Sequence, residues 1–372
     1  MEPIRVLHVV TLMNRGGLES MLMNYYRNID RNRIQFDFLE HREGKHDFTD
    51  EILSLGGKIY TVPPFNPLNT NGYINEIDNF FKENQEYKIV HSHLDTLSTY
   101  PLKYAKKYGV PNRIAHSHST SLGKNWKKII KMYSRSKITT YATQLFSCGE
   151  EAGKWLFNKS EFQILKNAID TKKFVYNSSI SYEKRKSLGI EDKFVIGHIG
   201  RFTKEKNHEF LIDIFEKIYQ KNKKSVLLLI GVGNLVDKMK EKVESLGLTS
   251  AVKFLGTRDD IHELLQAIDV FVFPSLYEGL PVTLVEAQAS GLNCIVSNTI
   301  SKEVDLTQNI KFLSLDKGPE IWSDFILDLM SIKDRENMYS QIRDKGFDIE
   351  SNVKWLENFY INLYNTRKMN SN

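Results

Sequence analysis

The chain has 372 residues, of which 41% are hydrophobic and 26% are charged, a composition typical of a globular protein that is too long for one core. Its two cysteines exclude a disulfide framework and suit a reducing compartment, while its net charge of +5 is modest. The acidic start and the lack of any membrane-length apolar run predict a cytoplasmic protein without a signal peptide or membrane span.

Short apolar segments rich in β-branched residues alternate with helix-length segments in the first half of the chain. The first strand-like segment, "RVLHVV" at 5–10, precedes a loop with two glycines and then the helix-like "LESMLMNYYRNI". Further strand-like segments follow at 35–39, 58–62, 87–91, 113–118 and 143–147. This alternation predicts a parallel sheet with helices on both faces.

The same pattern starts again at "FVIGHIG", residues 194–200, which precedes the helix-like "HEFLIDIFEKIYQ". Further strand-like segments follow at 225–231, 252–256, 269–273, 293–296 and 310–314. The segment 165–185 is polar and poorly periodic, and we interpret it as a hinge. We therefore predict an N-terminal domain at 1–165, a C-terminal domain at 166–350, and a helix within 351–372 that crosses back to the first domain.

Both halves are predicted to be doubly wound α/β domains. In such sheets ligands bind beyond the carboxyl ends of the strands. A cleft between the two domains is therefore the expected site, and the loops that follow the strands are the places to look for functional residues.

The stretch "YEGLPVTLVEAQASGL" contains two glutamates eight positions apart, Glu278 and Glu286. Pro281 suits the first turn of a helix and Gly291 suits its end, so we expect a helix from about Pro281 to Ser290. Free N–H groups at the start of this helix would attract an anion or a sugar hydroxyl. An ordinary helix with two surface acids is the alternative interpretation.

The loop "GRFTKEKNH" at 200–208 follows the first strand of the second half and contains Arg201 and Lys206. Arginine can bind a diphosphate through two nitrogens, and lysine adds a mobile positive charge. At the matching turn of the first half, Gly16 and Gly17 would let backbone N–H groups approach a ligand. Neither loop matches a known phosphate-binding motif, so a solvated loop and a plain tight turn remain open.

Two H-x-H pairs, His91/His93 and His116/His118, lie at ends of predicted strands. Residues two apart on a strand share a face, so each pair could bind zinc together with a carboxylate such as Asp95. A single histidine acting as a hydrogen-bond donor or acid/base, and histidines with a purely structural role, are the other interpretations. No further metal-binding motif supports the zinc site, and we predict no metal.

Ten lysines and arginines and no acidic residue lie between Thr96 and Gly149. Within this region 123–137 reads as a helix with an apolar stripe flanked by basic residues, which is typical of a helix on an anionic membrane. A helix whose stripe packs on the core is the alternative. No recognition motif for nucleic acid accompanies the basic residues.

Taken together, these motifs resemble the retaining GT-B glycosyltransferases of family 4 over nearly the whole chain. "YEGLPVTLVEAQASGL" is similar to the E-x7-E signature of that family, and "CGEEAGKWLF" is similar to members that build bacterial capsular and extracellular polysaccharide. The resemblance implies the GT-B fold, with two Rossmann-like domains and a cleft between them. It departs from the family pattern at Ala168 and Asn293, which leaves the identity of the donor open.

The resemblance also implies roles in binding a nucleotide-sugar donor. Arg201 and Lys206 would bind its diphosphate, together with backbone N–H groups of Gly16 and Gly17. Glu286 would hold the ribose hydroxyls. No D-x-D sequence is present, so no catalytic metal and no cofactor beyond the nucleotide sugar, expected to be a UDP-sugar, are implied.

Other residues would act at the reacting sugar. Glu278 would bind its hydroxyls, and His118 matches the histidine that the family places at the end of a first-domain strand. His116 is the alternative because the register is uncertain, and Arg258 would lie near the base. Backbone groups near the donor sugar would come from Leu280, Pro281 and Val282.

The resemblance thus implies transfer of a sugar, with retention of configuration, to a lipid-diphosphate-linked saccharide at the inner face of the plasma membrane. Two other functions stay open at this point. A metal-dependent hydrolase would use the H-x-H pairs, and a non-catalytic protein would bind the nucleotide sugar without turnover.

Overall fold

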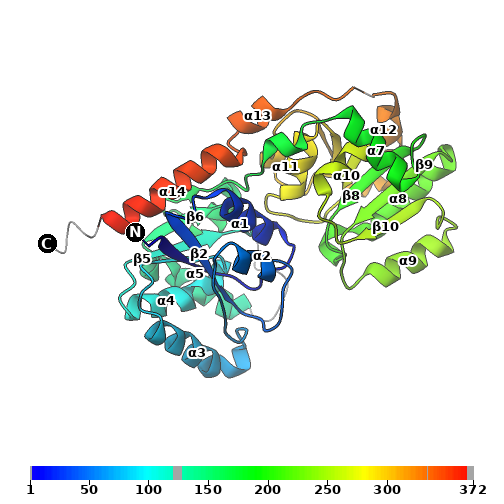
Figure 1. Ribbon diagram of the computed structural model, residues 1–372. Helices are drawn as coiled ribbons and strands as arrows, with labels where there is room; N and C mark the ends of the chain where they lie inside the picture. Colours follow the sequence, from blue (N-terminus) through cyan, green and yellow to red (C-terminus); the bar gives the residue numbers. More distant parts are fainter. Residues whose placement is uncertain (1, 120–127, 333, 367–372) are drawn as a thin grey trace. The chain divides into compact units, whose positions relative to one another are not determined.

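The computed structural model describes residues 2–119, 128–332 and 334–366 (Figure 1). The chain forms two compact units, unit 1 from 1–168 with 349–372, and unit 2 from 169–348. The boundaries predicted from the sequence, after 165 and after 350, lie within three residues of these positions. Among the described residues, no helix has the length and apolar character needed to cross a bilayer.

Unit 1 contains a seven-stranded sheet in the order β3-β2-β1-β4-β5-β6-β7, and all neighbouring strands are parallel. The strands are β1 (Ile4–Val9), β2 (Ile34–Glu40), β3 (Ile59–Thr61), β4 (Ile89–Ser92), β5 (Asn112–Ser117), β6 (Gln144–Ser147) and β7 (Gln163–Ile164). The helices are α1 (Gly17–Asn28), α2 (Thr49–Ser54), α3 (Thr70–Glu83), α4 (Thr99–Lys107), α5 (Lys128–Tyr141), α6 (Glu150–Phe157) and α14 (Ile349–Asn365). The alternation seen in the sequence therefore produces the expected parallel sheet.

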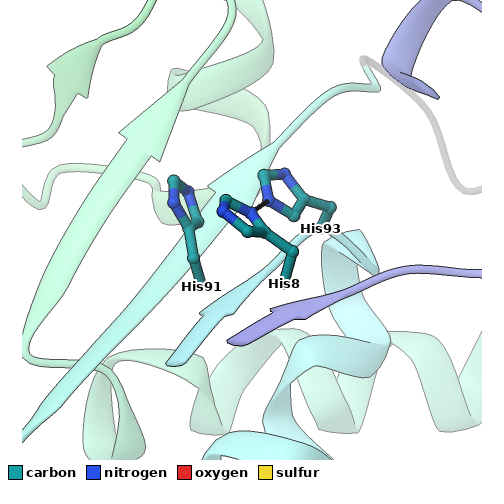
Figure 2. Close-up of side chains that lie close together, drawn as sticks. All are labelled: His8, His91 and His93. Atoms are coloured by element: carbon teal, nitrogen blue, oxygen red, sulfur yellow. Dashed lines mark hydrogen bonds between the residues drawn. The ribbon is translucent and has the colours of Figure 1, made fainter. Parts of the chain in front are cut away.

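The two faces of this sheet pack against different helices because successive strand residues point to opposite sides. Val6 of β1 packs in the cluster that includes α1 and α14, whereas Leu7 packs with α3 and α4. His8 shares the face of Val6 and is paired in register with His91 of β4, and His93 lies two residues further along (Figure 2). A row of imidazoles thus interrupts an otherwise apolar sheet face.

The C-terminal helix α14 is part of the core of unit 1 (Figure 1). Val353 and Tyr360 are buried in the same cluster as α1, because apolar residues recur at helical spacing along this segment. Glu357 accepts a hydrogen bond of 2.6 Å from the backbone N–H of Asp30. The helix thus closes the sheet face that carries the imidazoles.

Unit 2 contains a six-stranded parallel sheet in the order β10-β9-β8-β11-β12-β13. The strands are β8 (Phe194–Ile199), β9 (Ser225–Ile230), β10 (Val252–Gly256), β11 (Val270–Phe273), β12 (Asn293–Ser297) and β13 (Ile310–Leu313). The helices are α7 (Ser178–Leu188), α8 (His208–Lys221), α9 (Val236–Ser245), α10 (Ile261–Ala267), α11 (Val282–Ala289), α12 (Gly318–Asp328) and α13 (Tyr339–Asp344). The unit repeats the doubly wound plan of unit 1.

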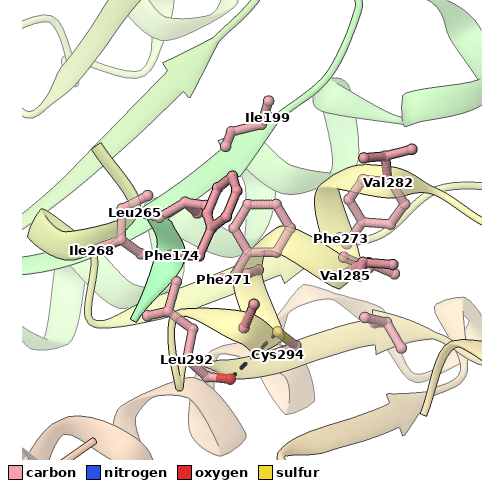
Figure 3. Packing of buried hydrophobic residues seen from close by; sticks show 14 of the residues in the cluster. Phe174, Ile199, Leu265, Ile268, Phe271, Phe273, Val282, Val285, Leu292 and Cys294 are labelled. Carbon is pink, nitrogen blue, oxygen red and sulfur yellow. Dashed lines mark hydrogen bonds between the residues drawn. The ribbon is translucent and has the colours of Figure 1, made fainter. Parts of the chain in front are cut away.

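The core of unit 2 fixes α11 firmly against the sheet (Figure 3). Val282 and Val285 of this helix pack in the same cluster as Phe271 and Phe273 of β11. Cys294 of β12 is a buried free thiol in this cluster. Because close-packed interiors leave little freedom for a helix to shift, the start of α11 is held in a defined position.

The segment 165–185 is more ordered than the hinge that the sequence predicted. The helix α7 begins within it, because the Asn177 side chain accepts the backbone N–H groups of Ser179 and Ile180 at 2.9 and 3.2 Å. Gly189 ends the helix with a φ of +64°. The sequence showed no helical pattern of apolar residues here, because Ser181 is the one buried residue of this polar helix.

Candidate functional site

Most of the functional residues predicted from the sequence follow strands at which the strand order reverses. In unit 2 the order reverses between β8 and β11, and in unit 1 between β1 and β4. Connections leave such a point toward opposite faces of the sheet, and a crevice opens beyond the carboxyl ends of the two strands. Each unit therefore has one edge suited to a ligand.

The loop after β8 places Arg201 and Lys206 at the edge of unit 2. This loop pairs with the loop after β9, because the backbone N–H of Phe202 donates to the carbonyl of Val232 at 2.9 Å. Gly233 permits the close approach, since a Cβ there would lie 2.5 Å from the Phe202 carbonyl oxygen. The Arg201 side chain is exposed and has no ion-pair partner among the described residues.

Lys206 and Glu278 form an ion pair across this edge. Their Nζ and Oε1 atoms are 2.7 Å apart, and the two side chains are only 18% and 17% exposed. The geometry is that of a close charge pair, since Oε1 makes no well-directed hydrogen bond. The Lys206 ammonium also lies 4.7 Å from the centre of the Phe273 ring, a cation–π contact. The structure thus brings together two residues that are 72 positions apart in the chain.

Further hydrogen bonds tie the Lys206 loop to the loop after β11. The backbone N–H of Leu276 donates to the Glu205 carbonyl at 2.8 Å, and the Tyr277 hydroxyl donates to the Glu205 carboxylate at 2.9 Å. The Asn207 side chain donates to the Pro274 carbonyl at 3.1 Å. These bonds hold the lysine and glutamate in register before any ligand arrives.

The helix α11 begins at Val282, with Pro281 in extended conformation directly before it. Pro281 is therefore the N-cap residue and not a first-turn residue, a shift of one position from the prediction. Gly291 adopts a φ of +69°, as expected of the residue beyond a helix end. The side chains of Leu280, Pro281 and Val282 are buried, so only their backbone groups can meet a ligand.

Glu286 lies in the second turn of α11 and is partly buried. Desolvation raises the pKa of its carboxyl to about 7, because burial disfavours the charged form. A carboxylate in such surroundings gains from hydroxyl donors that replace its lost water. The contact of Glu286 with the ribose diol, which the resemblance assigns to it, stays a prediction.

Arg258, predicted to lie near the base, follows β10 and is held by Asp260. Its Nε and Nη2 atoms donate to the two carboxylate oxygens at 2.7 and 2.6 Å. Lys184 also donates to this carboxylate at 2.7 Å. Arg258 is thus engaged in an ion-pair network, and its contact with a base stays a prediction.

The glycine loop of unit 1 connects β1 to α1. Gly16 is the N-cap residue of α1 in extended conformation, and Gly17 is the first residue of the helix. A Cβ added to Gly17 would meet no atom within 4 Å. Neither packing nor backbone strain requires glycine at position 17, so its small size leaves open space at the start of the helix.

The histidines of unit 1 form a connected group. His8 Nδ1 lies 3.0 Å from His93 Nε2 (Figure 2). His93 Nδ1 lies 3.0 Å from His118 Nε2. In a second chain, His91 Nε2 lies 3.1 Å from His116 Nδ1. The sequence indicated two separate H-x-H pairs, whereas the sheet pairs the histidines across strands and adds a member from β1.

His118 and the alternative, His116, differ in exposure. His116 is fully buried, whereas His118 is partly exposed, and its backbone N–H donates to Asp95 at 2.8 Å. Burial lowers the pKa of the His118 imidazole to about 3, so the ring is neutral at physiological pH. The structure therefore favours His118 as the histidine that can meet a substrate.

The cluster is also the place in the described chain where a metal could be held. Two groups of three imidazoles have nitrogens within 4.8 Å of one another, namely His8, His91, His93 and His93, His116, His118. Both ring nitrogens of His93 already face other imidazoles, and a metal would compete for the same lone pairs. The carboxylate expected from Asp95 belongs to neither group.

Two side chains to which the sequence analysis gave no role belong to these edges. Thr283, in the first turn of α11, has a buried hydroxyl without a hydrogen-bond partner among the described residues. His8 completes the longer histidine chain from β1. A role for the Thr283 side chain could have been predicted from its place in the first turn after Pro281. The role of His8 could not be predicted, because its contact with His93 depends on the order of the strands in the sheet.

Comparisons with known proteins agree with this architecture. A family profile described as Glycosyl transferases group 1 matches residues 180–345. EpsF of Bacillus subtilis (strain 168), whose name assigns it provisionally to the glycosyltransferases, is 40% identical over 368 residues, which are 96% of each chain. An Escherichia coli enzyme, UDP-Gal:alpha-D-GlcNAc-diphosphoundecaprenol alpha-1,3-galactosyltransferase, is 28% identical over 75% of this chain and 76% of its own.

Among solved structures, Anabaena Alr3699/HepE in complex with UDP and glucose superposes with a TM-score of 0.78. It is 17% identical and covers 96% of this chain and 99% of its own, so it supports the fold alone. The two α/β units are therefore those of GT-B glycosyltransferases. On the strength of the near full-length match to EpsF, the chain belongs to the glycosyl transferases of group 1.

Proposed function

We propose that this glycosyltransferase moves a sugar from a UDP-sugar to a lipid-diphosphate-linked saccharide, with retention of configuration, during assembly of a capsular or extracellular polysaccharide. The E. coli relative is named for a UDP-linked donor and a diphosphoundecaprenol acceptor. CapH of Staphylococcus aureus, 27% identical over 96% of this chain, is named for capsular polysaccharide biosynthesis. These names support the donor, acceptor and process proposed here.

The observation that carries the proposal is the Lys206–Glu278 pair beside the start of α11. A donor diphosphate would attract Lys206, while hydroxyls of the attached sugar would donate to Glu278. The ligand would thus replace one ion pair by two sets of charge-assisted hydrogen bonds. The N–H groups of Val282 and Thr283, which have no acceptor within the helix, would add donors at the same place.

The chemical step follows from the charges that develop as the bond between sugar and diphosphate breaks. The leaving diphosphate gains negative charge, which Arg201 and Lys206 would stabilise, and the sugar becomes positively polarised next to Glu278. Preorganised groups of this kind are worth about 3 kcal/mol each in comparable sites. The departing phosphate can take the proton of the acceptor hydroxyl, so this scheme requires neither a protein base nor a metal.

Other parts of the donor would be bound by groups of lower charge. Glu286 would accept hydrogen bonds from the ribose hydroxyls. Gly16 and Gly17 would let backbone N–H groups approach the diphosphate, and His118 would bind a hydroxyl of the reacting sugar.

We further propose that the enzyme acts in the cytoplasm at the inner membrane face, with contact through the basic region 123–137. Part of that region, 123–127, lies outside the described residues. The rest belongs to α5, on which Met132 and Tyr133 are 54% and 63% exposed. An exposed apolar pair on a helix rich in lysine is what contact with an anionic bilayer requires.

A donor screen tests the proposal directly. UDP-sugars are offered with a lipid-diphosphate monosaccharide, and the anomeric configuration of the product is determined by NMR. We expect one preferred UDP-sugar, a product of the same configuration as the donor, and unchanged activity in EDTA. A donor that is bound without turnover for any acceptor would favour a nucleotide-sugar sensor, and zinc-dependent hydrolysis would favour the hydrolase alternative.

A further inference from the structure

Five imidazoles lie on the face of the unit 1 sheet that α1 and α14 cover, in two hydrogen-bonded chains. The longer chain starts at His8, which is 1% exposed, passes through His93 and ends at the partly exposed His118. The shorter chain joins His116 and His91 to the hydroxyl of Tyr360 on α14, at 3.1 and 2.7 Å. Only the longer row of imidazoles reaches a partly exposed residue, His118, at the edge of the sheet where a substrate can bind.

The members of the longer chain are neutral. Burial lowers the pKa values of His8 and His118 to about 3 and that of His93 well below its usual value. A neutral imidazole has one N–H and one lone pair, on opposite nitrogens. Since each link of the chain needs one donor and one acceptor, the proton position on one ring determines the position on the next.

Only two proton arrangements satisfy both links of the chain. In the first, His8 Nδ1 donates to His93, His93 Nδ1 donates to His118, and His118 carries its proton on Nδ1. In the second, all donors are reversed, and His8 carries its proton on Nε2. His8 Nε2 is buried and has no hydrogen-bond partner among the described residues, so it is the end of the chain that distinguishes the two arrangements.

The first arrangement leaves an unpaired lone pair at His8, whereas the second leaves an unpaired N–H. Buried N–H groups without partners are the rarer defect in folded proteins, so the first arrangement is favoured. His118 then has its proton on Nδ1, an atom that makes no hydrogen bond to any residue in the described ranges.

We propose that His93, itself oriented by His8, is a positioning residue that fixes the tautomer of His118, so that His118 offers an Nδ1–H to a hydroxyl oxygen of the reacting sugar. The assignment of that oxygen to the sugar rests on the proposed function, whereas the tautomer does not. The row of hydrogen-bonded imidazoles fixes the direction of each hydrogen bond. An imidazole that could carry its proton on either nitrogen would offer an Nδ1–H only part of the time. The edge is thereby kept uncharged and still donates a hydrogen bond.

The tautomer is measured by NMR on the full chain labelled with ¹⁵N-histidine. Long-range ¹H–¹⁵N correlations distinguish an Nδ1–H from an Nε2–H ring, and the signals of His118 are assigned by their loss in His118→Gln. We expect the Nδ1–H form in the unmodified protein and in Tyr360→Phe, which alters only the shorter chain. An Nε2–H form of His118 in the unmodified protein would overturn the proposal.

Two substitutions of His93 separate hydrogen bonding from packing. In His93→Asn the side-chain amide keeps a donor at the position of Nδ1, whereas His93→Leu is apolar. We expect His93→Leu to give mixed tautomers at His118 and a kcat about tenfold lower with KM little changed, and His93→Asn to stay within about threefold of the unmodified enzyme.

Each remaining result is decisive. Equal losses in the Asn and Leu variants, or an unchanged tautomer in the Leu variant, would reduce His93 to a packing role and refute the proposal. Zinc retained in the purified protein, with loss of the imidazole–imidazole links, would also refute it. An unmodified protein without transferase activity would contradict the proposed function, while the NMR result would still decide the tautomer.

Discussion

The two strand-order reversals of this molecule have the same topology and opposite electrostatics. The edge of unit 2 carries full charges, with Lys206 and Glu278 paired at 2.7 Å and Arg201 exposed on the loop that carries Lys206. The edge of unit 1 ends in neutral imidazoles and a glycine loop. The charges of Lys206 and Glu278 are mostly buried but offset each other, whereas the buried imidazoles have no opposite charge beside them and stay neutral because burial disfavours their charged form. Two units with the same strand-order reversal thus differ in what they offer a ligand: unit 2 offers charged side chains, and unit 1 offers neutral hydrogen-bonding groups.

The comparison predicts that losing a charge from unit 2 has the largest effect. Lys206→Ala should lower kcat by about 10²- to 10³-fold, because a preorganised donor to the leaving group is lost. Single-turnover kinetics with saturating donor measures the loss. Lys204→Ala is the matched control, since Lys204 lies on the same short helix and is exposed. Equal rates for the unmodified enzyme and Lys206→Ala would remove the phosphate role from this edge.

Glu278→Gln keeps the shape of the side chain and removes its charge. We expect a loss in kcat approaching that of Lys206→Ala, because the positively polarised sugar loses its carboxylate partner. Circular dichroism and the melting temperature should show an intact fold. Full transfer activity in this variant would contradict the assignment of the site.

Glu286 links the charged edge to pH. Its carboxyl has a pKa of about 7 in the folded protein, compared with about 4.5 in the unfolded chain. Between these two pH values the folded protein therefore holds a proton that the unfolded chain has released. The free energy of unfolding therefore falls as pH rises from about 4.5 to 7. Above pH 7 the loss of stability is complete and stays constant. Glu286→Gln should raise stability at pH 8 by on the order of 2 kcal/mol and change little at pH 4.

The same substitution should weaken the binding of the UDP-sugar about tenfold at pH 8, because charge-assisted hydrogen bonds to the ribose are lost. Calorimetric titration at pH 6 and pH 8 measures the effect. In the unmodified protein we expect tighter binding at pH 8, where the carboxylate is ionised. A pH-independent affinity would separate Glu286 from the donor.

A bulky residue at the glycine loop tests the uncharged edge. Gly17→Val places its side chain where no atom of the protein lies within 4 Å of a Cβ, so the melting temperature should change little. If the diphosphate approaches this backbone, KM for the donor should rise about fivefold, as expected when a hydrogen bond of about 1 kcal/mol is lost. An unchanged KM would limit the donor contacts to unit 2.

Tyr360→Phe has the smallest expected effect, on stability alone. It removes the hydroxyl at 2.7 Å from His91 Nδ1 and leaves the ring packed, so unfolding in urea should show a loss of about 1 kcal/mol. Tyr133→Phe, at an exposed position, is the control. Equal stability of both variants would show that the shorter chain needs no hydroxyl from α14.

Much of the fold followed from local patterns. Each strand of the two sheets except β7 was predicted within two residues of its ends, because parallel strands buried on both faces are continuous apolar segments. The two-residue β7 is too short to show any pattern. The helix α7 was missed because it is polar on most sides, and its caps at Asn177 and Gly189 were the available signal.

The site divides in the same way. Arg201 and Lys206 could be found because they lie in a loop that follows a predicted strand, and Glu278 because it belongs to the stretch similar to the E-x7-E signature. The ion pair between Lys206 and Glu278 could not be predicted, because the sequence does not show which loops lie next to each other. The base contact of Arg258 was implied by the family resemblance, and the structure adds an ion pair with Asp260 that sequence spacing did not indicate.

The sequence by itself determined the two α/β halves, the loops that carry the candidate site residues and, to within one residue, the start of the helix at Pro281. Strand, helix and cap signals act over a few neighbouring residues. Only the tertiary structure decided that His8 joins the histidines of β4 and β5, and that a lysine and a glutamate from separate loops become partners. Those contacts depend on strand order and register, which are set by the packing of whole sheets and leave no local trace in the chain.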